Sequence, residues 1–417
     1  TLEDCLRIGI DNNLSLEGKR KEIQRSKYGV SENRSKLLPQ INAIAGYSNN
    51  FDPPVSVTDG SSYGVPYNIT QTLQHSANAG LEMQMPLFNQ TLYTSMSIAK
   101  VMEEISRLSY GKAREDVILQ ISKMYYLGQV TAEQIMLIKA NITRLEELRD
   151  ITQAFFDNGM SMEVDLKRVN INLENLKVQY DNAQAMMKQQ LNMLKYIMDY
   201  PAEKEIALTP VNTDSITTVA LTGLSENIYE LQLSQSQVQL AERQKKIITN
   251  GYIPSLSLTG SWRYAAYTDK GYHWFHSGPS NQWFRSYGVG LTLRIPIFDG
   301  LDKTYKIKKA MIDIENKRLA WEDARKNLQT QYLNAVNDLM NNQRNFKKQK
   351  DNYLLAEDVY AVTSDRYREG IASMTEVLQD EMQMSEAQNN YISAHYNYRV
   401  TNLMLLKLTG QIESLVK

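Results

Sequence analysis

The sequence contains the same structural unit twice, and this duplication limits the possible fold more than any other feature. The segment PLFNQ in the first half returns as PIFDG in the second, and Gly159 and Gly370 occupy equivalent places. Self-similarity at a fixed offset indicates repeated structure. We therefore predict two repeats, residues 1–200 and 223–417, joined by a linker over residues 201–222.

Proline marks where the long helices of each repeat can lie. The sequence has no proline in residues 87–200 or 297–417, and proline disrupts helix interiors. Steps of three and four between apolar residues, typical of a coiled coil, join Leu166, Val169, Leu173, Leu176 and Tyr180. We predict two helical hairpins that turn at Gly159 and Gly370, because such turns favour a residue that tolerates positive φ. The first helix would be about 100 Å long.

Polar and apolar residues alternate between the first helix and the long hairpin of each repeat, which is typical of a two-faced strand. The predicted strands cover about residues 40–49, 78–86, 254–267 and 283–296. Proline lacks the N–H that a strand ladder needs and is accepted in the first turn of a helix. We therefore predict strand–helix junctions at Pro39, Pro86, Pro254 and Pro296.

Composition excludes several classes of protein. The net charge of −1 gives no basic field for nucleic acid. The single cysteine, Cys5, allows no internal disulfide and is expected to be a small buried residue. The sequence contains no run of about 18 consecutive apolar residues, so it predicts no membrane-spanning helix. The opening TLEDCLRIGI lacks Met, and we expect a mature form whose signal peptide was removed.

Chemistry-bearing motifs are missing from the sequence. It contains no paired nucleophile and base, no phosphate-binding loop and no cluster with the spacing of metal ligands, so we predict neither enzymatic activity nor a cofactor. The segment HWFH, residues 273–276, falls in a predicted external loop without further ligands, which disfavours a metal site there.

Four two-faced strands cannot close a barrel alone, and an open sheet in lipid would leave unpaired edges. Three copies would supply twelve strands, so transport as a function favours a homotrimer. Aromatic residues concentrate at membrane interfaces, which suggests this place for Trp262, Tyr264, Trp283 and Tyr287. The alternative for these aromatic side chains is the core of a soluble sheet.

In their order, and twice over, these segments resemble the TolC-like family of outer-membrane efflux proteins. TLEDCLRIGIDNNLSL is similar to the family's opening helix, LLPQI and YIPSL to its strand beginnings, and PLFNQ and PIFDG to its strand ends. RYREGIASMTEVLQ resembles its second hairpin turn, and LLKLTG its closing helix. The resemblance implies a fold that is mainly α with membrane β: a homotrimeric 12-stranded β-barrel joined to an α-helical barrel.

The resemblance also implies a place and partners. It implies a passive exit duct in the outer membrane of a Gram-negative-type cell, in contact with outer-membrane lipid and with a long periplasmic portion. Such a duct serves tripartite efflux or type I secretion and is opened by a periplasmic adaptor and an inner-membrane RND, ABC or MFS transporter. Drug efflux, metal efflux and protein secretion are not separated by the sequence.

A periplasmic gate is implied by the positions near the two turns. Asp165 falls at the family's gating aspartate, Tyr367 at its tyrosine partner and Glu376 on a ring of carboxylates, for which we expect a preference for cations. The chain departs from the family pattern, since Ala372 replaces an arginine and Gln379 an aspartate. Two nearby arginines offer a substitute, Arg366 and Arg368.

The hairpin turns are expected to present apolar side chains for adaptor docking, because Met160 follows Gly159 and Ile371 follows Gly370. A different class of function is a non-channel coiled-coil scaffold of the periplasm. A scaffold would explain the helices and the duplication. It would not explain four alternating strands with long polar loops.

Overall fold

The computed structural model describes residues 1–417 apart from 72, 211–222, 269–282 and 417. The chain forms two compact units, each built from segments of both sequence repeats. We call the first the hairpin unit; it comprises Thr1–Ile23, Ile105–Gln235 and Arg318–Lys417. We call the second the sheet unit; it comprises Gln24–Glu104 and Ser236–Lys317. The gaps contain part of the predicted linker and the HWFH segment, which therefore lie outside the described residues.

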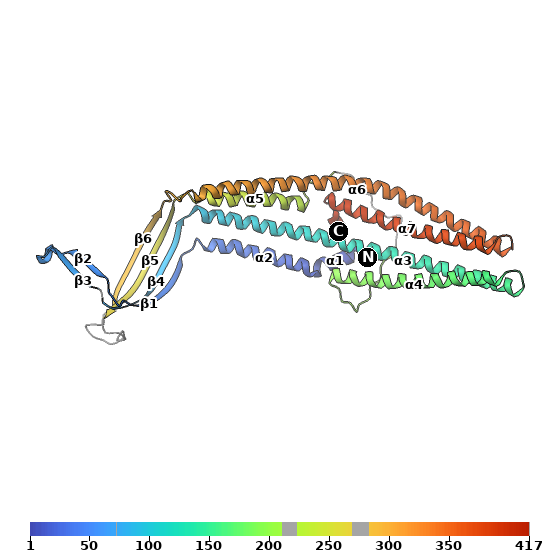
Figure 1. The fold of residues 1–417 in the computed structure, drawn as a ribbon, viewed down its shortest axis with the longest axis horizontal. Coiled ribbons are helices and arrows are strands. Elements are labelled where there is room, and N and C mark those ends of the chain that lie inside the picture. Colours follow the sequence, from blue (N-terminus) through green and yellow to red (C-terminus); the bar gives the residue numbers. More distant parts are fainter. Residues whose placement is uncertain (72, 211–222, 269–282, 417) are drawn as a thin grey trace. The chain divides into compact units, whose positions relative to one another are not determined.

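Two long helical hairpins dominate the described chain, as predicted (Figure 1). In the first, α3 (Gln90–Asp157) is followed by α4 (Glu163–Met198), and in the second α6 (Asp302–Arg368) is followed by α7 (Met374–Leu408). Both α3 and α6 contribute residues to both units. The remaining helical segments are α1 (Leu2–Asn12), α2 (Leu14–Ser35), α5 (Tyr229–Asn250) and the 3-10 turns η1 (Ser61–Tyr63) and η2 (Ile412–Val416).

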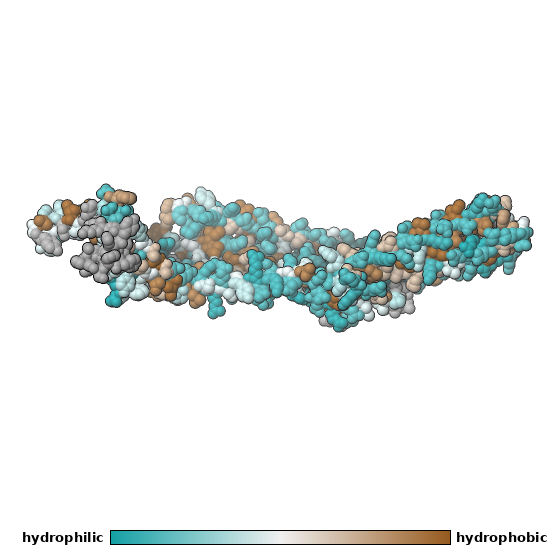
Figure 2. All heavy atoms as spheres, turned by 90° about the horizontal axis from the view of Figure 1, so that it is seen from below, coloured by the Kyte–Doolittle hydropathy of each residue, from teal (hydrophilic) through white to brown (hydrophobic). Residues whose placement is uncertain are grey.

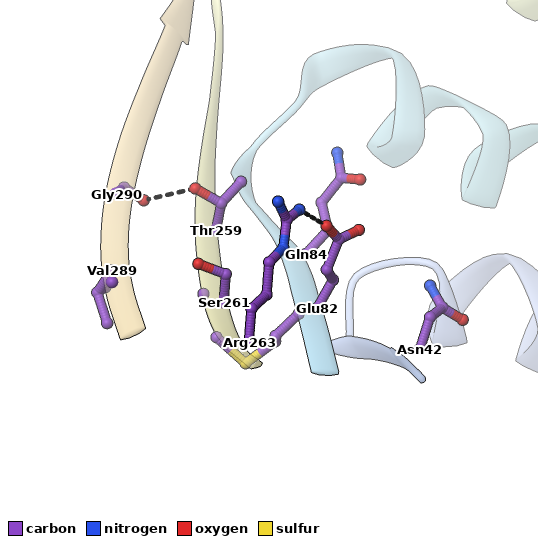
Figure 3. Close-up of a pocket in the computed structure, with 11 residues that line it drawn as sticks. Asn42, Glu82, Gln84, Thr259, Ser261, Arg263, Val289 and Gly290 are labelled. Carbon is purple, nitrogen blue, oxygen red and sulfur yellow. Dashed lines mark hydrogen bonds and ion pairs between the residues drawn. The ribbon is translucent and has the colours of Figure 1, made fainter. Parts of the chain in front are cut away.

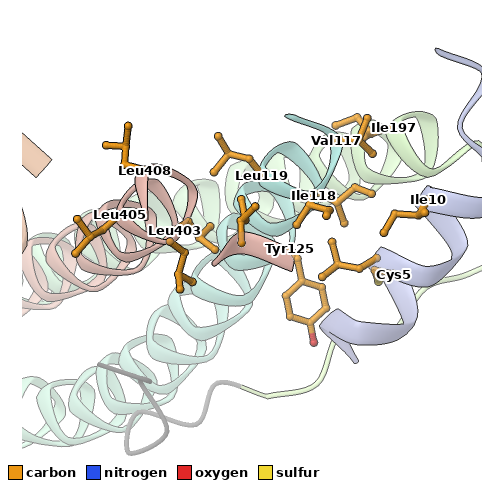
Figure 4. Close-up of a cluster of buried hydrophobic side chains, with 14 of the residues drawn as sticks. Cys5, Ile10, Val117, Ile118, Leu119, Tyr125, Ile197, Leu403, Leu405 and Leu408 are labelled. Carbon is orange, nitrogen blue, oxygen red and sulfur yellow. The ribbon is translucent and has the colours of Figure 1, made fainter. Parts of the chain in front are cut away.

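The core of the hairpin unit lies where α1 meets the helices of both hairpins (Figure 4). A capping box between Thr1 and Asp4 starts α1, whose buried face carries Cys5, Leu6 and Ile10. Cys5 is 7% exposed, so the prediction of a small buried residue is confirmed. A second buried cluster, including Leu148, Val169 and Val377, follows the hairpins toward their turns.

The sheet unit contains a four-stranded antiparallel sheet in the order β1-β4-β5-β6 (Figure 1). Its strands are β1 (Gln40–Asn49), β4 (His75–Phe88), β5 (Ser255–Thr268) and β6 (Trp283–Arg294). The four predicted strands are therefore present, and β4 is longer than predicted. The first and second sequence repeats each supply two neighbouring strands.

The junction prolines lie close to their predicted places, with one correction. Pro39 and Pro254 directly precede β1 and β5, and Pro296 follows the end of β6. Pro86, in contrast, lies inside β4, which continues to Phe88. The pairing of β4 with β1 ends at Gln84, so beyond that point β4 pairs with β5 alone and its register shifts next to the proline. A proline is accepted at such an irregular, one-sided position.

A hairpin in the loop between β1 and β4 was not predicted. It consists of β2 (Val55–Asp59) and β3 (Tyr67–Gln71), which pair with each other in a separate two-stranded sheet. The described residues thus contain six strands instead of four. Alternation over only five residues per strand is too short to stand out from a polar loop.

Candidate functional site: a hairpin-tip cleft and a two-faced sheet

The turns of both helical hairpins have the same backbone structure. Gly159 has φ 72° and Gly370 has φ 76°. The N–H of Met160 donates to the carbonyl of Phe155 at 2.8 Å, and the N–H of Ile371 donates to that of Arg366 at 2.8 Å. This is the Schellman arrangement, which needs a left-handed residue after the last helical turn and therefore favours glycine.

Apolar side chains are exposed at both turns. At the first turn, Met160 is 68% exposed and Met162 is 66% exposed. At the second turn, Ile371 is 63% exposed. Figure 2 shows hydrophobic atoms among hydrophilic ones at this end of the hairpins. The structure thus places both residues of the predicted docking surface at the tips and in contact with solvent.

A cleft of about 640 Å³ lies between the two tips. Both α4 and α7 begin at this cleft, and α6 ends there. The structure brings together two of the three predicted gate residues, since Asp165 and Tyr367 both line the cleft. Its other lining residues include Phe155, Met162, Arg168 and Thr375.

Tyr367 is buried and fixes one tip to the other. Its side chain is 6% exposed, and its hydroxyl donates to Oγ1 of Thr152 in α3 at 3.3 Å. The rings of Tyr367 and Phe155 lie 5.6 Å apart. Burial raises the pKa of Tyr367, and the charge of Asp165 raises it further. The hydroxyl therefore stays protonated and remains a donor.

Asp165 bonds to a residue that the sequence analysis did not identify. Oδ1 of Asp165 accepts from Nη1 of Arg168 at 3.2 Å, and the same nitrogen approaches Oγ1 of Thr375 at 3.4 Å. Arg168 thus joins the beginning of α4 to the beginning of α7. The only signal in the sequence was the spacing of three residues between Asp165 and Arg168. No hydrogen bond joins Asp165 directly to Tyr367 within the described part of one chain.

The arginines proposed as substitutes lie in different surroundings. Nη2 of Arg368 is 3.5 Å from Oε2 of Glu147 in α3, so this ion pair also joins the two hairpins. Arg366 is exposed. Ala372 is 9% exposed and belongs to the apolar cluster near the turns, while Gln379 is exposed.

Glu376 caps the helix on which it lies. Its carboxylate accepts from the N–H of Ser373 at 3.3 Å, and the hydroxyl of Ser373 accepts from the N–H of Glu376 at 3.3 Å. This reciprocal capping box starts α7. Glu376 is exposed and is not among the cleft-lining residues. Its charge therefore has a local structural role besides any effect on ions.

Further along the hairpins, a buried polar pair and a partly buried hydrogen bond join α3 to α7. Nδ2 of Asn141 donates to Oε1 of Gln388 at 2.7 Å, and both side chains are less than a tenth exposed. The hydroxyl of Tyr391 donates to Oε1 of Glu133 at 2.9 Å. Buried polar pairs are costly to separate because each group would lose its partner. The tip contacts of Arg168 and Arg368 are more exposed and correspondingly weaker.

The sheet has one apolar face and one polar face. On the apolar face, Trp262 lies opposite both Leu81 and Tyr287, and Ala266 lies opposite Trp283. Tyr264 lies on the same face, with its ring 5.5 Å from that of Trp262. All four aromatic residues predicted for the membrane interface therefore share one face.

The polar face carries an ion pair between Glu82 of β4 and Arg263 of β5 (Figure 3). A shallow cleft of about 500 Å³ lies over this face, lined by Ser261 and Thr259 among others. Gly288 and Gly290 of β6 contribute to the hollow because they have no side chains. The face is thus suited to water and not to lipid.

Within the described residues, no helix has an apolar window long enough to cross a membrane. No group of three or more His, Cys, Asp or Glu side chains in that part of the chain is arranged to hold a metal ion. The HWFH segment lies outside it, so neither finding concerns that segment.

A sheet with one apolar and one polar face, continued by long helical hairpins, defines the class of outer-membrane channel proteins with a helical extension. A family model described as "Outer membrane efflux protein" matches residues 8–198 and 220–411. The chain therefore belongs to the outer membrane efflux protein family, whose members are outer-membrane channels and not enzymes. This membership and the two-faced sheet argue against the coiled-coil scaffold alternative.

Curated relatives match over most of their length. Outer membrane protein TolC of Vibrio cholerae is 21% identical over 399 residues, which cover 92% of this chain and 84% of the relative. The probable efflux pump outer membrane protein TtgC of Pseudomonas putida is 23% identical over 379 residues, covering 86% of this chain and 75% of the relative.

Solved structures share the fold. A structure of CusC superposes with a TM-score of 0.81 at 16% identity, over 98% of this chain and 91% of that one. The open state of the MtrE outer membrane channel of Neisseria gonorrhoeae superposes with a TM-score of 0.77 at 19% identity, over 98% and 88% of the two chains.

Proposed function

We propose that three copies of this chain form a passive exit duct through the outer membrane. A periplasmic adaptor and an inner-membrane pump of the RND, ABC or MFS type would open the duct at its periplasmic end. The observation that carries this proposal is the two-faced sheet. Its apolar face, with Trp262 and Tyr287, suits lipid, and its polar face, with Glu82 and Arg263, suits a water-filled interior.

The edges of the sheet support assembly from several copies. The outer strands β1 and β6 run in opposite directions, because all neighbours in the order β1-β4-β5-β6 are antiparallel. The β6 strand of one copy can therefore pair with β1 of the next in the same antiparallel sense. Three copies give twelve strands, enough for a closed barrel with an open interior.

Exposed apolar side chains on the helices also support a homotrimer. Val164, Ile171 and Val178 of α4 lie at heptad spacing and are 42%, 61% and 58% exposed. On α6 the exposed apolar residues at heptad spacing include Ile312 with Leu319, Leu333 with Met340, and Leu355 with Val362. Such stripes are typical of coiled-coil seams and need a partner in water. Helices of a neighbouring copy would cover them.

We propose that the tip contacts hold the periplasmic end closed. Three of them join the two hairpins of one chain: Tyr367 with Thr152, Arg168 with Thr375, and Arg368 with Glu147. Asp165 orients Arg168. An adaptor docked on Met160 and Ile371 would separate these contacts, while the buried Asn141–Gln388 pair keeps the hairpins together. Three Glu376 carboxylates near the opening would favour cations.

The experiment that tests the duct is single-channel recording in a planar bilayer. The unmodified protein is expected to give small steps, because its tips are closed. The double variant Asp165→Ala, Tyr367→Phe removes the orienting carboxylate and the donor to Thr152, so larger steps are expected. Unchanged steps in the double variant would refute the gate, and the absence of steps in both proteins would refute the duct.

A further inference from the structure

The hairpin β2–β3 presents an exposed apolar face. In its register, Val57 pairs with Ile69, and the same face carries Val55 and Tyr67. These four side chains are 55–68% exposed. The opposite face carries Ser56, Thr58 and Thr70. A two-stranded hairpin alone in water is marginally stable, so this apolar face needs a covering surface.

The base of the hairpin is fixed at one end of the sheet. The hydroxyl of Tyr47, near the end of β1, is 2.9 Å from Nδ1 of His75, the first residue of β4. The N–H of Asn50 donates to the carbonyl of Gln74 at 2.8 Å. The hairpin therefore projects from the point where β1, an outer strand, ends (Figure 1). Figure 2 shows hydrophobic atoms on this projection.

In the proposed barrel, the neighbour of β1 is β6 of the next copy. Because the two strands are antiparallel, the end of β1 and the beginning of β6 lie toward the same rim of the barrel. The beginning of β6 carries Phe284, which is 56% exposed and lies on the same face of the strand as Ser286. We infer that the apolar face of the β2–β3 hairpin packs on Phe284 of a neighbouring copy and joins the copies at the outer rim of the barrel. This inference rests on the proposed trimer.

Charge favours a second copy over the anionic lipid surface as the occupant. Residues 50–74 contain Asp52 and Asp59 and no lysine or arginine. Segments that bind anionic membrane surfaces are rich in basic residues, so this composition does not suit lipid phosphates. The beginning of β6 carries Arg285, which is exposed and complements the two aspartates.

Cysteine cross-linking in the full-length protein, purified in detergent or kept in outer membranes, tests the inference. The background is Cys5→Ser, which removes the single native cysteine. The test pair is Ile69→Cys with Phe284→Cys, and the matched control is Thr70→Cys with Phe284→Cys, since Thr70 lies on the opposite face. A third set combines Ala45→Cys of β1 with Tyr287→Cys, Val289→Cys or Leu291→Cys of β6, because the stagger of a closed barrel shifts the register between copies. Linkage at any of these positions reports barrel closure without the hairpin.

Mild oxidation is expected to link copies several-fold faster in the Ile69→Cys, Phe284→Cys protein than in the Thr70→Cys, Phe284→Cys control. Linkage through Ala45→Cys is expected as well, because it reports the closed barrel. Linkage through Ala45 without a preference for Ile69 would overturn the inference and leave the trimer intact. Failure of every pair, including all three positions tested with Ala45, would overturn both the trimer and the inference.

A second measurement does not depend on cysteines. Val57→Asn with Ile69→Asn polarises the apolar face, and Ser56→Asn with Thr70→Asn makes matched changes on the polar face. The temperature at which the trimer dissociates on semi-native gels is expected to fall by several degrees for the first variant alone, with the helical circular dichroism unchanged. Equal behaviour of the two variants would overturn the inference.

Discussion

At the scale of single residues, Arg168 is the arginine that contacts Asp165, whereas Arg368 pairs with Glu147 and Arg366 is exposed. Arg168 connects Asp165 to Thr375 and so lies between the two hairpin tips. A guanidinium suits this place because its several donors are held in one plane. Arg168 lies in α4. Ala372, which stands where the family pattern has an arginine, lies just before α7.

We predict that Arg168→Ala increases single-channel conductance, because it removes both bonds of the guanidinium at the tip. The loss from such a partly exposed contact is about 1 kcal/mol, enough to shift a closed–open equilibrium about fivefold. Arg366→Ala is the matched control, since it removes an exposed arginine from the neighbouring helix end. An equal effect of the two variants would show that net charge, and not this contact, controls conductance.

The buried carboxyl group of Glu115 in α3 leads to a prediction about pH. Glu115 is 4% exposed, and burial raises its pKa to about 7, with Lys407 opposing this shift. Because the folded pKa lies above the unfolded value, the folded protein takes up a proton first as the pH falls. Stability is therefore expected to increase as the pH falls from about 7 toward 4.5.

Glu115→Gln should abolish this increase and stabilise the protein at pH 8 by roughly 1 to 3 kcal/mol. Chemical unfolding between pH 5 and pH 8 measures the effect. Asp181→Asn is the control, since Asp181 is an exposed carboxylate of α4 that does not act on Glu115. A pH dependence that persists in Glu115→Gln would assign the proton uptake to another group.

At the scale of elements, the two turns show what the sequence could predict. Gly159 and Gly370 were expected to turn the hairpins, and both adopt positive φ with the same hydrogen bonds. A backbone requirement of this kind is met by one residue type and is therefore visible in the sequence. The capping box of Ser373 and Glu376 is also a local pattern. The sequence alone did not separate it from a pore-lining role, because a carboxylate at this position suits both. The bond from Arg168 to Thr375 crosses between helices far apart in the chain, so no local pattern indicates it.

We predict that Gly370→Ala destabilises the protein by about 1 to 2 kcal/mol, because an L-residue with left-handed φ is strained. Gly18→Ala is the control: Gly18 lies in α2 with open space around its Cα, so alanine should be neutral or slightly stabilising there. Thermal unfolding of both variants measures the difference. Equal midpoints would mean that the turn at Gly370 relaxes without cost.

At the scale of the whole molecule, alternation along the strands and heptads along the helices indicated the fold from sequence. Both patterns extend over ten residues or more, so local exceptions such as Ile44 do not hide them. The β2–β3 hairpin lacked this length. Its exposed apolar face and the exposed stripes of α4 and α6 have one explanation in common. In the proposed trimer each of these surfaces would be covered by a neighbouring copy.

The stripe on α4 leads to a test of assembly. We predict that Ile171→Asp with Val178→Asp prevents trimer formation, because each change places a charge in a seam that would bury an apolar side chain worth about 1.5 to 3 kcal/mol. Asn170→Asp with Gln184→Asp adds the same charge on another exposed side of α4 and should leave the trimer intact. Light scattering after size-exclusion chromatography in detergent gives the mass of each variant. Trimers of the Ile171 and Val178 variant would show that α4 faces solvent in the assembled duct, and the helical seam would then have to be formed by other surfaces.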